Sequence, residues 1–187
     1  MAELLGDFIS GGAERKNTKQ DKENKIYGVF IRSILTQKVI LSITEIGGNI
    51  KQNLEQKIVD KNEGKCIPEG FIRPNSVRII NYSSGNVSSE NIEFHAVFEC
   101  LICHPVEGQI IECHVKTITK AGIHAEVMDN EVVPITVFMA RDHHNTNKQF
   151  AAIKENAVIY ARVIGIRFEL NDSYICVIGQ LIDKSSI

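Results

Sequence analysis

The sequence lacks long hydrophobic runs, an excess of charge of one sign, and an even number of cysteines. Its longest apolar runs, such as residues 157–166, are interrupted by Arg162 and fall far short of the roughly 20 residues that a membrane-spanning helix needs. No secretory signal opens the chain, and its five cysteines are an odd number. We therefore expect a reducing compartment, no disulfide framework and no membrane contact.

The net charge of −2 excludes a basic surface over the whole molecule. The second half is no more basic, because residues 106–187 carry eight Lys and Arg against ten Asp and Glu, which is again −2. A positive long-range field is what draws many proteins to nucleic acid. Any contact with nucleic acid must therefore be local, and weak when it acts alone.

The chain has 187 residues, 43% of them hydrophobic, which is enough for two small domains that each bury a core. Before the first domain, residues 1–25 pass from a short apolar patch (Leu4, Leu5, Phe8 and Ile9) into an almost entirely polar stretch. We interpret residues 1–25 as a flexible arm. The alternative is an unstructured extension that has no specific role.

Residues 26–105 have the pattern of a small α+β sheet domain. Runs rich in Val, Ile and Phe predict strands over residues 27–35, 38–43, 72–81 and 92–103. A helix is expected between the second and third strands, because Ile50, Leu54 and Ile58 recur every four residues. Asn49 and Gln52 fit a capping box at its start, and Gly64 fits a left-handed stop after its end.

A glycine-bounded loop follows this helix. It has a proline inside and apolar groups without a periodic partner face, which suits docking into another protein. The alternative is an ordinary hairpin connection. The candidate docking residues are Gly64, Lys65, Cys66, Ile67, Pro68, Glu69, Gly70 and Phe71.

Residues 106–187 have the layout of a five-stranded OB-fold barrel. His104-Pro105 ends the preceding sheet, and a long polar connection, residues 141–156, follows the third of five predicted antiparallel strands. The whole chain is thus predicted to be α+β and mostly β. The five barrel strands are expected at residues 108–118, 122–127, 132–139, 158–168 and 174–182.

Strand alternation assigns the two faces of the barrel. It points Phe138 and His124 outward, where aromatic rings can stack on the bases of single-stranded RNA. The alternative for Phe138 is a place beneath the 141–156 connection. The side chains predicted to point inward are Ile111, Cys113, Val115, Ile123, Ala125, Val127, Ile135, Val137 and Met139. The candidate RNA contacts are Lys116, Lys120, His124, Phe138, Arg141, His143 and Arg162, the basic groups serving phosphates.

No metal, cofactor or catalytic site is expected. Cys100, Cys103 and His104 resemble zinc ligands, but positions 100 and 103 of a strand face opposite ways and their flanks are apolar. We interpret these cysteines as small buried side chains. His143 and His144 are adjacent in a polar loop, with no matched nucleophile or paired carboxylate.

Several segments together resemble one protein family. The run from residue 58 to 66, with Gly70-Phe71-Ile72 after it, is similar to the helix end and tip loop of the seventh subunit of eukaryotic RNA polymerase II and of its archaeal stalk counterpart. The likeness extends over about residues 26–187 and rests on the order of the segments, because none is specific by itself. The similar junction and barrel segments are residues 95–98, 105–110, 121–123, 137–143 and 178–181.

The resemblance implies a non-catalytic stalk subunit of a DNA-directed RNA polymerase. Its first domain, a truncated RNP-like fold, would dock through the tip loop on the polymerase core and pair with a small helical fourth-subunit-like partner. Its barrel would meet nascent single-stranded RNA. The expected location is the nucleus for a cellular protein, and a cytoplasmic viral factory or the virion for a viral one. The alternative is a free-standing OB-fold RNA-binding protein of translation or RNA processing.

Overall fold

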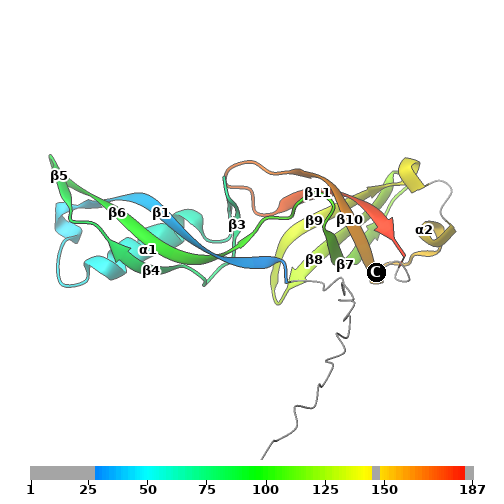
Figure 1. Ribbon diagram of the computed structural model, residues 1–187, viewed down its shortest axis with the longest axis horizontal. Helices are drawn as coiled ribbons and strands as arrows, with labels where there is room; N and C mark the ends of the chain where they lie inside the picture. The colour runs from blue at the N-terminus through cyan, green and yellow to red at the C-terminus, as the bar shows by residue number, and fades with distance from the viewer. Residues whose placement is uncertain (1–27, 145–147, 184–187) are drawn as a thin grey trace, which may run out of the picture.

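The computed structural model describes residues 28–144 and 148–183, so the predicted arm at residues 1–25 lies outside the described residues. The molecule is elongated, with a sheet and one long helix at one end and a closed barrel at the other (Figure 1). No helix among the described residues has the length and apolar character to cross a membrane.

Two long strands form the spine of the sheet. β1 (Phe30–Ser42) pairs antiparallel with β6 (Asn91–Cys103) over its whole length, from Phe30 opposite Cys103 to Ser42 opposite Asn91. The two strands predicted over residues 27–35 and 38–43 are therefore one continuous strand. The shorter strands are β2 (Cys66–Ile67), which pairs with β3, and three that pair with β6: β3 (Gly70–Ile72), β4 (Arg78–Tyr82) and β5 (Asn86–Ser88).

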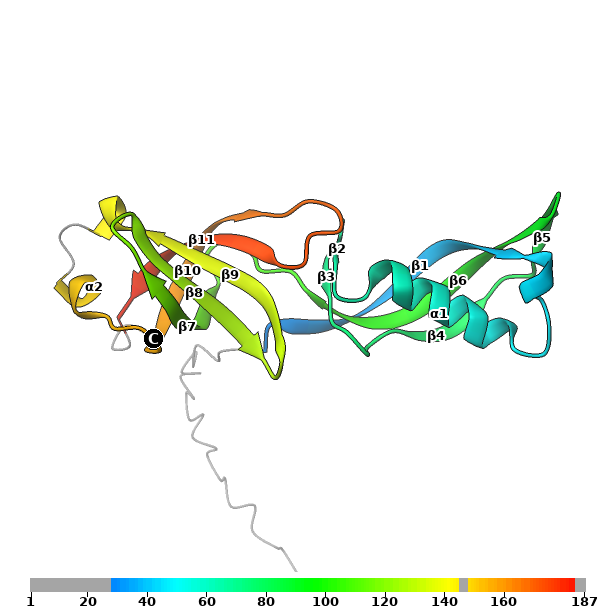
Figure 2. The ribbon, with the colours of Figure 1, turned by 180° about the vertical axis from the view of Figure 1, so that it is seen from behind.

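The helix α1 (Ile50–Asn62) covers one face of this sheet, as Figure 2 shows. Leu54 and Ile58 are buried among sheet residues such as Leu41 and Phe98, so the predicted helix period is confirmed. Asn49 holds the N-cap position as predicted, but the predicted capping box is wrong, because the Asn49 side chain makes no cap hydrogen bond. The capping box lies earlier, at Ser42 and Glu45 of a short 3₁₀ turn, η1 (Ile43–Glu45). The left-handed Gly64, with φ of +70°, follows the helix as predicted.

The barrel has the strand order β7-β8-β9-β11-β10, closed by pairing of β10 with β7. This is the strand order of an OB fold. One detail of the prediction is wrong, because β9 and β11 run parallel while every other pair is antiparallel. The strands are β7 (Ile110–Ile118), β8 (Gly122–Asp129), β9 (Val132–Ala140), β10 (Val158–Arg167) and β11 (Ile175–Ile182).

The side chains predicted to point into the barrel are all buried. One barrel end is closed by the connection after β9, which contains η2 (Arg141–His144) and α2 (Lys148–Ala152). Phe150 of α2 is buried and its ring stacks on that of His144, with centroids 4.5 Å apart. His144 also contacts two strands, since its Nδ1 lies 2.7 Å from the Ala140 carbonyl and its Nε2 accepts from the Leu181 amide at 3.0 Å.

The sheet and the barrel share a hydrophobic core at their junction. Cys66, Phe71 and Cys103 belong to the sheet by pairing, yet they are buried in the same cluster as the barrel interior. The Cys66 amide donates to the Asp172 carbonyl at 2.8 Å, and the Asn171 amide donates to the Cys66 carbonyl at 2.9 Å. The sheet half still buries a cluster of its own beneath α1, with Leu54, Ile58 and Phe98, so the junction adds sheet residues to the barrel core without replacing the sheet core.

Candidate nucleic-acid and docking surfaces

His124 and Phe138 lie side by side on the outer face of β8 and β9. They are opposite one another in register, and their ring centroids are 4.8 Å apart at 41°. The Phe138 ring also leans over Gly122, since a Cβ built there would lie 3.0 Å from Phe138 Cε2. This placement leaves Phe138 half-buried on the outer face. Phe150 is the buried phenylalanine of the 141–156 connection.

Ile178 extends this pair into a row across three strands, and sequence reasoning did not find it. It lies opposite Phe138 in the parallel β9–β11 ladder and is 50% exposed. The row His124–Phe138–Ile178, here called the platform, offers a continuous apolar and aromatic surface of the kind on which unpaired bases stack. Ile178 could be found only by knowing that β11 pairs with β9, which is a contact between distant parts of the chain.

Two of the predicted basic contacts differ from the others, since one is paired with a carboxylate and one lies on a strand away from the platform. Lys116 forms an ion pair with Glu126, so its charge is matched by a neighbouring carboxylate. Arg162 lies on β10, opposite Gln180 of β11 and Ile110 of β7. Because β10 neighbours neither β8 nor β9, the barrel holds Arg162 apart from His124 and Phe138.

The other basic candidates lie at the barrel end. Lys120 is exposed in the β7–β8 turn, and His143 is exposed in η2. Arg141 is half-buried, and its guanidinium donates from Nε to the Lys120 carbonyl and from Nη2 to the Thr119 carbonyl, both at 3.0 Å. A hollow of about 460 Å³ is lined by Thr119, Lys120, Arg141 and Ile118.

The predicted docking loop, residues 64–71, lies at the junction with the barrel. Cys66, Gly70 and Phe71 are buried there. Pro68 and Glu69 are exposed, while the remaining residues are half-buried. A hollow of about 340 Å³ lies beside this tip and is lined also by Leu35, Phe98 and Leu170. The surface available for docking is thus narrower than the eight residues predicted.

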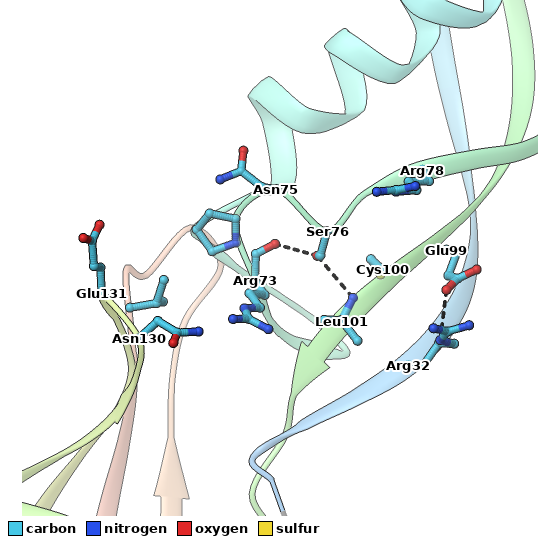
Figure 3. A pocket seen from close by; sticks show the side chains of 12 residues that line it. Arg32, Arg73, Asn75, Ser76, Arg78, Glu99, Cys100, Leu101, Asn130 and Glu131 are labelled. Carbon is cyan, nitrogen blue, oxygen red and sulfur yellow. Dashed lines mark hydrogen bonds and ion pairs between the residues drawn. The ribbon is translucent and has the colours of Figure 1, made fainter.

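A cleft of about 850 Å³ lies between the sheet and the β8–β9 turn (Figure 3). Arg32 and Glu99 form an ion pair of 3.0 Å on the sheet side. Arg73 forms one of 3.1 Å with Asp129 of the barrel. Asn130 and Glu131 line the cleft from the barrel side, and Figure 3 shows Asn130 directed toward Arg73. Sequence reasoning missed this cleft, because its lining comes from four distant segments: β1, residues 73–78, β6 and the β8–β9 turn.

The sheet face opposite α1 is partly apolar. Ile34 and Ile40 of β1 lie on this face and are 63% and 50% exposed. Val97 and Leu101 of β6 lie on the same face, opposite Thr36 and Arg32 of β1, and both are half-buried. Ion pairs Lys38–Glu93 and Arg32–Glu99 alternate with these apolar groups. The face, here called the open face, continues into the cleft through Arg32, Glu99 and Leu101.

Four of the five cysteines are buried packing groups, and Cys176 is exposed. Cys100 is buried in the core beneath α1, whereas Cys103 is buried in the barrel-side core, so the two face opposite ways as predicted. Burial raises the pKa of Cys100 to about 11, and the pKa values of Cys103 and Cys113 to about 12. Among residues 28–144 and 148–183, no group of three His, Cys, Asp or Glu side chains could hold a metal ion.

The chain has relatives among known proteins, although no protein-family model matches it. It is 28% identical to a putative DNA-directed RNA polymerase subunit of Acanthamoeba polyphaga mimivirus, over 84% of each chain. It is 23% identical to the DNA-directed RNA polymerase II subunit RPB7 of Glycine max, over 78% of this chain and 89% of the relative. The corresponding subunit 7 of Arabidopsis thaliana is also 23% identical, over 75% of this chain and 86% of the relative.

These alignments each span at least three quarters of the chain, so each includes residues of both the sheet and the barrel. The resemblance noted in the sequence is therefore confirmed. The chain is related to the RPB7-type subunits of DNA-directed RNA polymerases.

Proposed function

We propose that this chain is a non-catalytic stalk subunit of a DNA-directed RNA polymerase, docked through its sheet half and presenting its barrel to nascent RNA. The observation that carries the proposal is similarity to polymerase subunits over both halves of the chain, from a virus and from plants. The proposed location depends on the source of the chain. Similarity to the plant subunits supports the nucleus for a cellular protein, and similarity to the viral subunit supports a viral factory or the virion for a viral one.

The proposed contact between the barrel and RNA is supported by the platform. His124, Phe138 and Ile178 form one row on the outer face of an OB-type barrel, the surface that such barrels use for single strands. Stacking of one base on an aromatic side chain contributes about 1 to 3 kcal/mol. With a chain charge of −2, affinity must come mainly from such local contacts and from tethering beside the RNA.

Docking on the polymerase core is supported by the tip of the 64–71 loop. Pro68 and Glu69 are exposed at the tip of a loop whose base is fixed. The base is fixed because both the amide and the carbonyl of Cys66 are hydrogen-bonded to the β10–β11 turn. A rigid, exposed tip loses little conformational entropy when it binds. We assign core docking to Lys65, Ile67, Pro68 and Glu69, with Cys66, Gly70 and Phe71 as their support.

A small helical partner would cover the open face and the cleft. Ile34 and Ile40 are apolar groups on a sheet face that α1 leaves free, and an amphipathic helix buries such groups. Glu99 and Arg32 at the cleft edge offer charges of both signs to a mixed polar surface. The partner therefore needs an apolar helix face with charged residues on either side.

Affinity purification of the tagged chain from its own source, followed by mass spectrometry, tests this function. We expect the large polymerase subunits and one small helical protein. The double variant Ile34→Glu/Ile40→Glu should lose the helical protein, and Val87→Glu, at a position 71% exposed on β5, should retain it. Recovery of ribosomal or RNA-processing proteins without polymerase would instead identify a free-standing RNA-binding protein.

A further inference from the structure

The barrel end beside the platform contains an arginine that is already held in place. Arg141 follows the last residue of β9 and donates two hydrogen bonds to successive carbonyl oxygens of the β7–β8 turn, at Thr119 and Lys120. These bonds use Nε and one of the two terminal nitrogens, so Nη1 keeps its two donors for a ligand. An arginine fixed in this way loses little side-chain entropy on binding an anion.

The support behind Arg141 is itself buried. Its guanidinium carbon lies 6.0 Å from the centroid of the Phe150 ring, which is 4% exposed and stacked on His144. His144 in turn contacts Ala140 of β9 and Leu181 of β11. The connection after β9 therefore fixes Arg141 against the barrel as well as closing the barrel end.

A second cation faces the same hollow. Lys120 is exposed, and its ammonium takes part in none of the hydrogen bonds or ion pairs found in the described parts of the chain. Two carboxylates lie near these cations or the hollow. Asp142 is exposed next to Arg141 in the chain, and Glu155 accepts a hydrogen bond from the amide of Ile118, a lining residue, at 3.5 Å. Neither forms an ion pair with Lys120 or Arg141, so both cations are available to an anion.

The hollow is aligned with the platform along β9. Arg141 is three residues after Phe138, about 10 Å at 3.3 Å per residue. Between them, Gly122 lies opposite Ala140, so the row that separates the platform from the hollow has only small side chains. A Cβ at Gly122 would collide with the Met139 carbonyl, so a larger residue is excluded from this row. The Phe138 ring covers Gly122, so the edge of the platform reaches the row next to the hollow.

We propose that Arg141 and Lys120 form a preformed phosphate site that holds one backbone phosphate of the RNA strand whose base stacks on the platform. The proposal rests on the RNA-binding part of the proposed function and adds the place where the strand is anchored. Arg141 supplies a fixed pair of donors, and Lys120 supplies a mobile charge on the other side of the hollow. The site holds phosphate and not a base edge, so it is indifferent to sequence.

The test measures binding of a short, fluorescently labelled single-stranded RNA to the full chain over a range of salt concentrations. We expect Arg141→Ala and Lys120→Ala each to weaken binding and to reduce the slope of log K against log salt by about 0.7 to 1. Arg32→Ala is the charge-matched control, because it removes one cation from the distant sheet and should leave the slope unchanged. Lys120→Ala removes an exposed side chain, so its effect cannot come from unfolding.

The outcomes separate this proposal from the proposed function. If the wild-type chain binds RNA and Phe138→Ala weakens binding, but both cation variants keep the wild-type slope, the phosphate site is refuted and the platform stands. If Arg32→Ala lowers the slope as much as the two site variants do, the effect is one of overall charge and the site is refuted. If the wild-type chain binds no RNA, both the site and the RNA-binding part of the function are refuted.

Discussion

At the scale of single residues, two phenylalanines twelve positions apart have different tasks. Phe150 is 4% exposed and closes the barrel end together with His144. Phe138 is half-buried on the outer face, where its ring lies over Gly122 and beside His124. Strand alternation was enough to point Phe138 outward, because parity is a local property of β9. It could not reveal Ile178, which the parallel ladder brings next to Phe138.

Replacing Phe138 with Ala should lower RNA affinity by about 1 to 3 kcal/mol, since a stacking surface is lost. The free energy of unfolding should fall by only about 1 kcal/mol, because the ring is half-buried. Phe150→Ala is the matched control and should lower the unfolding free energy by about 3 to 5 kcal/mol, as core phenylalanines do. RNA binding and urea denaturation measure the two effects. Equal destabilisation by both changes with unaltered RNA binding would show that Phe138 is a packing residue.

The cysteines give a prediction about pH. Burial raises the pKa values of Cys103 and Cys113 from the ordinary 9.0 to about 12. The unfolded chain therefore releases these protons near pH 9 while the folded chain retains them. This contribution to stability is complete below pH 9 and is lost as pH rises toward 12. Urea denaturation between pH 8 and 11 should show falling stability, and Cys103→Ala/Cys113→Ala should show a shallower fall. An equally steep fall in the double variant would contradict this assignment.

At the scale of elements, the 64–71 loop connects the helix, the sheet and the barrel. Gly70 has φ of +134°, and a Cβ there would collide with the Cys103 carbonyl. Sequence reasoning recognised the bounding glycines and the loop between them. It did not predict that Cys66 and Phe71 would be buried against the barrel, because that burial depends on the β10–β11 turn, about a hundred residues later.

Gly70→Ala should therefore destabilise the protein strongly, by about 3 kcal/mol or more, through both backbone strain and overlap with the β6 backbone. Gly108→Ala is the control, since Gly108 also has positive φ, +84°, but nothing lies within 4 Å of a Cβ there. Its cost should be only about 1 to 2 kcal/mol, the left-handed backbone penalty alone. Thermal melts of the two variants measure the difference. Equal melting temperatures would mean that Gly70 is not in close contact with β6.

At the scale of the whole molecule, the sheet and the barrel are joined by a shared hydrophobic cluster at their junction. The helix and the five barrel strands could be predicted to within a few residues, because hydrophobic period and turn residues are local signals. The strand predicted over residues 72–81 is wrong, since it is divided into β3 and β4, and the short strands β2 and β5 were not predicted. Three features could not be predicted, because each joins segments far apart in the chain. They are the β9–β11 pairing, the cleft with its Arg73–Asp129 ion pair, and the shared core. Those non-local contacts also form the platform and the cleft, the surfaces for which we propose binding.

A shared core predicts that sheet and barrel unfold together. Calorimetry should give one transition whose calorimetric and van't Hoff enthalpies agree. Phe71→Ala, which removes a side chain only 2% exposed at the junction, should move that whole transition to lower temperature. Two separate transitions, of which Phe71→Ala moves one, would show two independent domains.

In the function that we propose, this chain places the outer face of its barrel on RNA within a transcribing polymerase. A photo-crosslinking amino acid at position 178, introduced into the polymerase that contains the chain, tests this most directly. We expect a crosslink from position 178 to nascent RNA, and from position 34 on the open face to protein. A crosslink from position 178 to protein alone, with no RNA captured during active transcription, would contradict it.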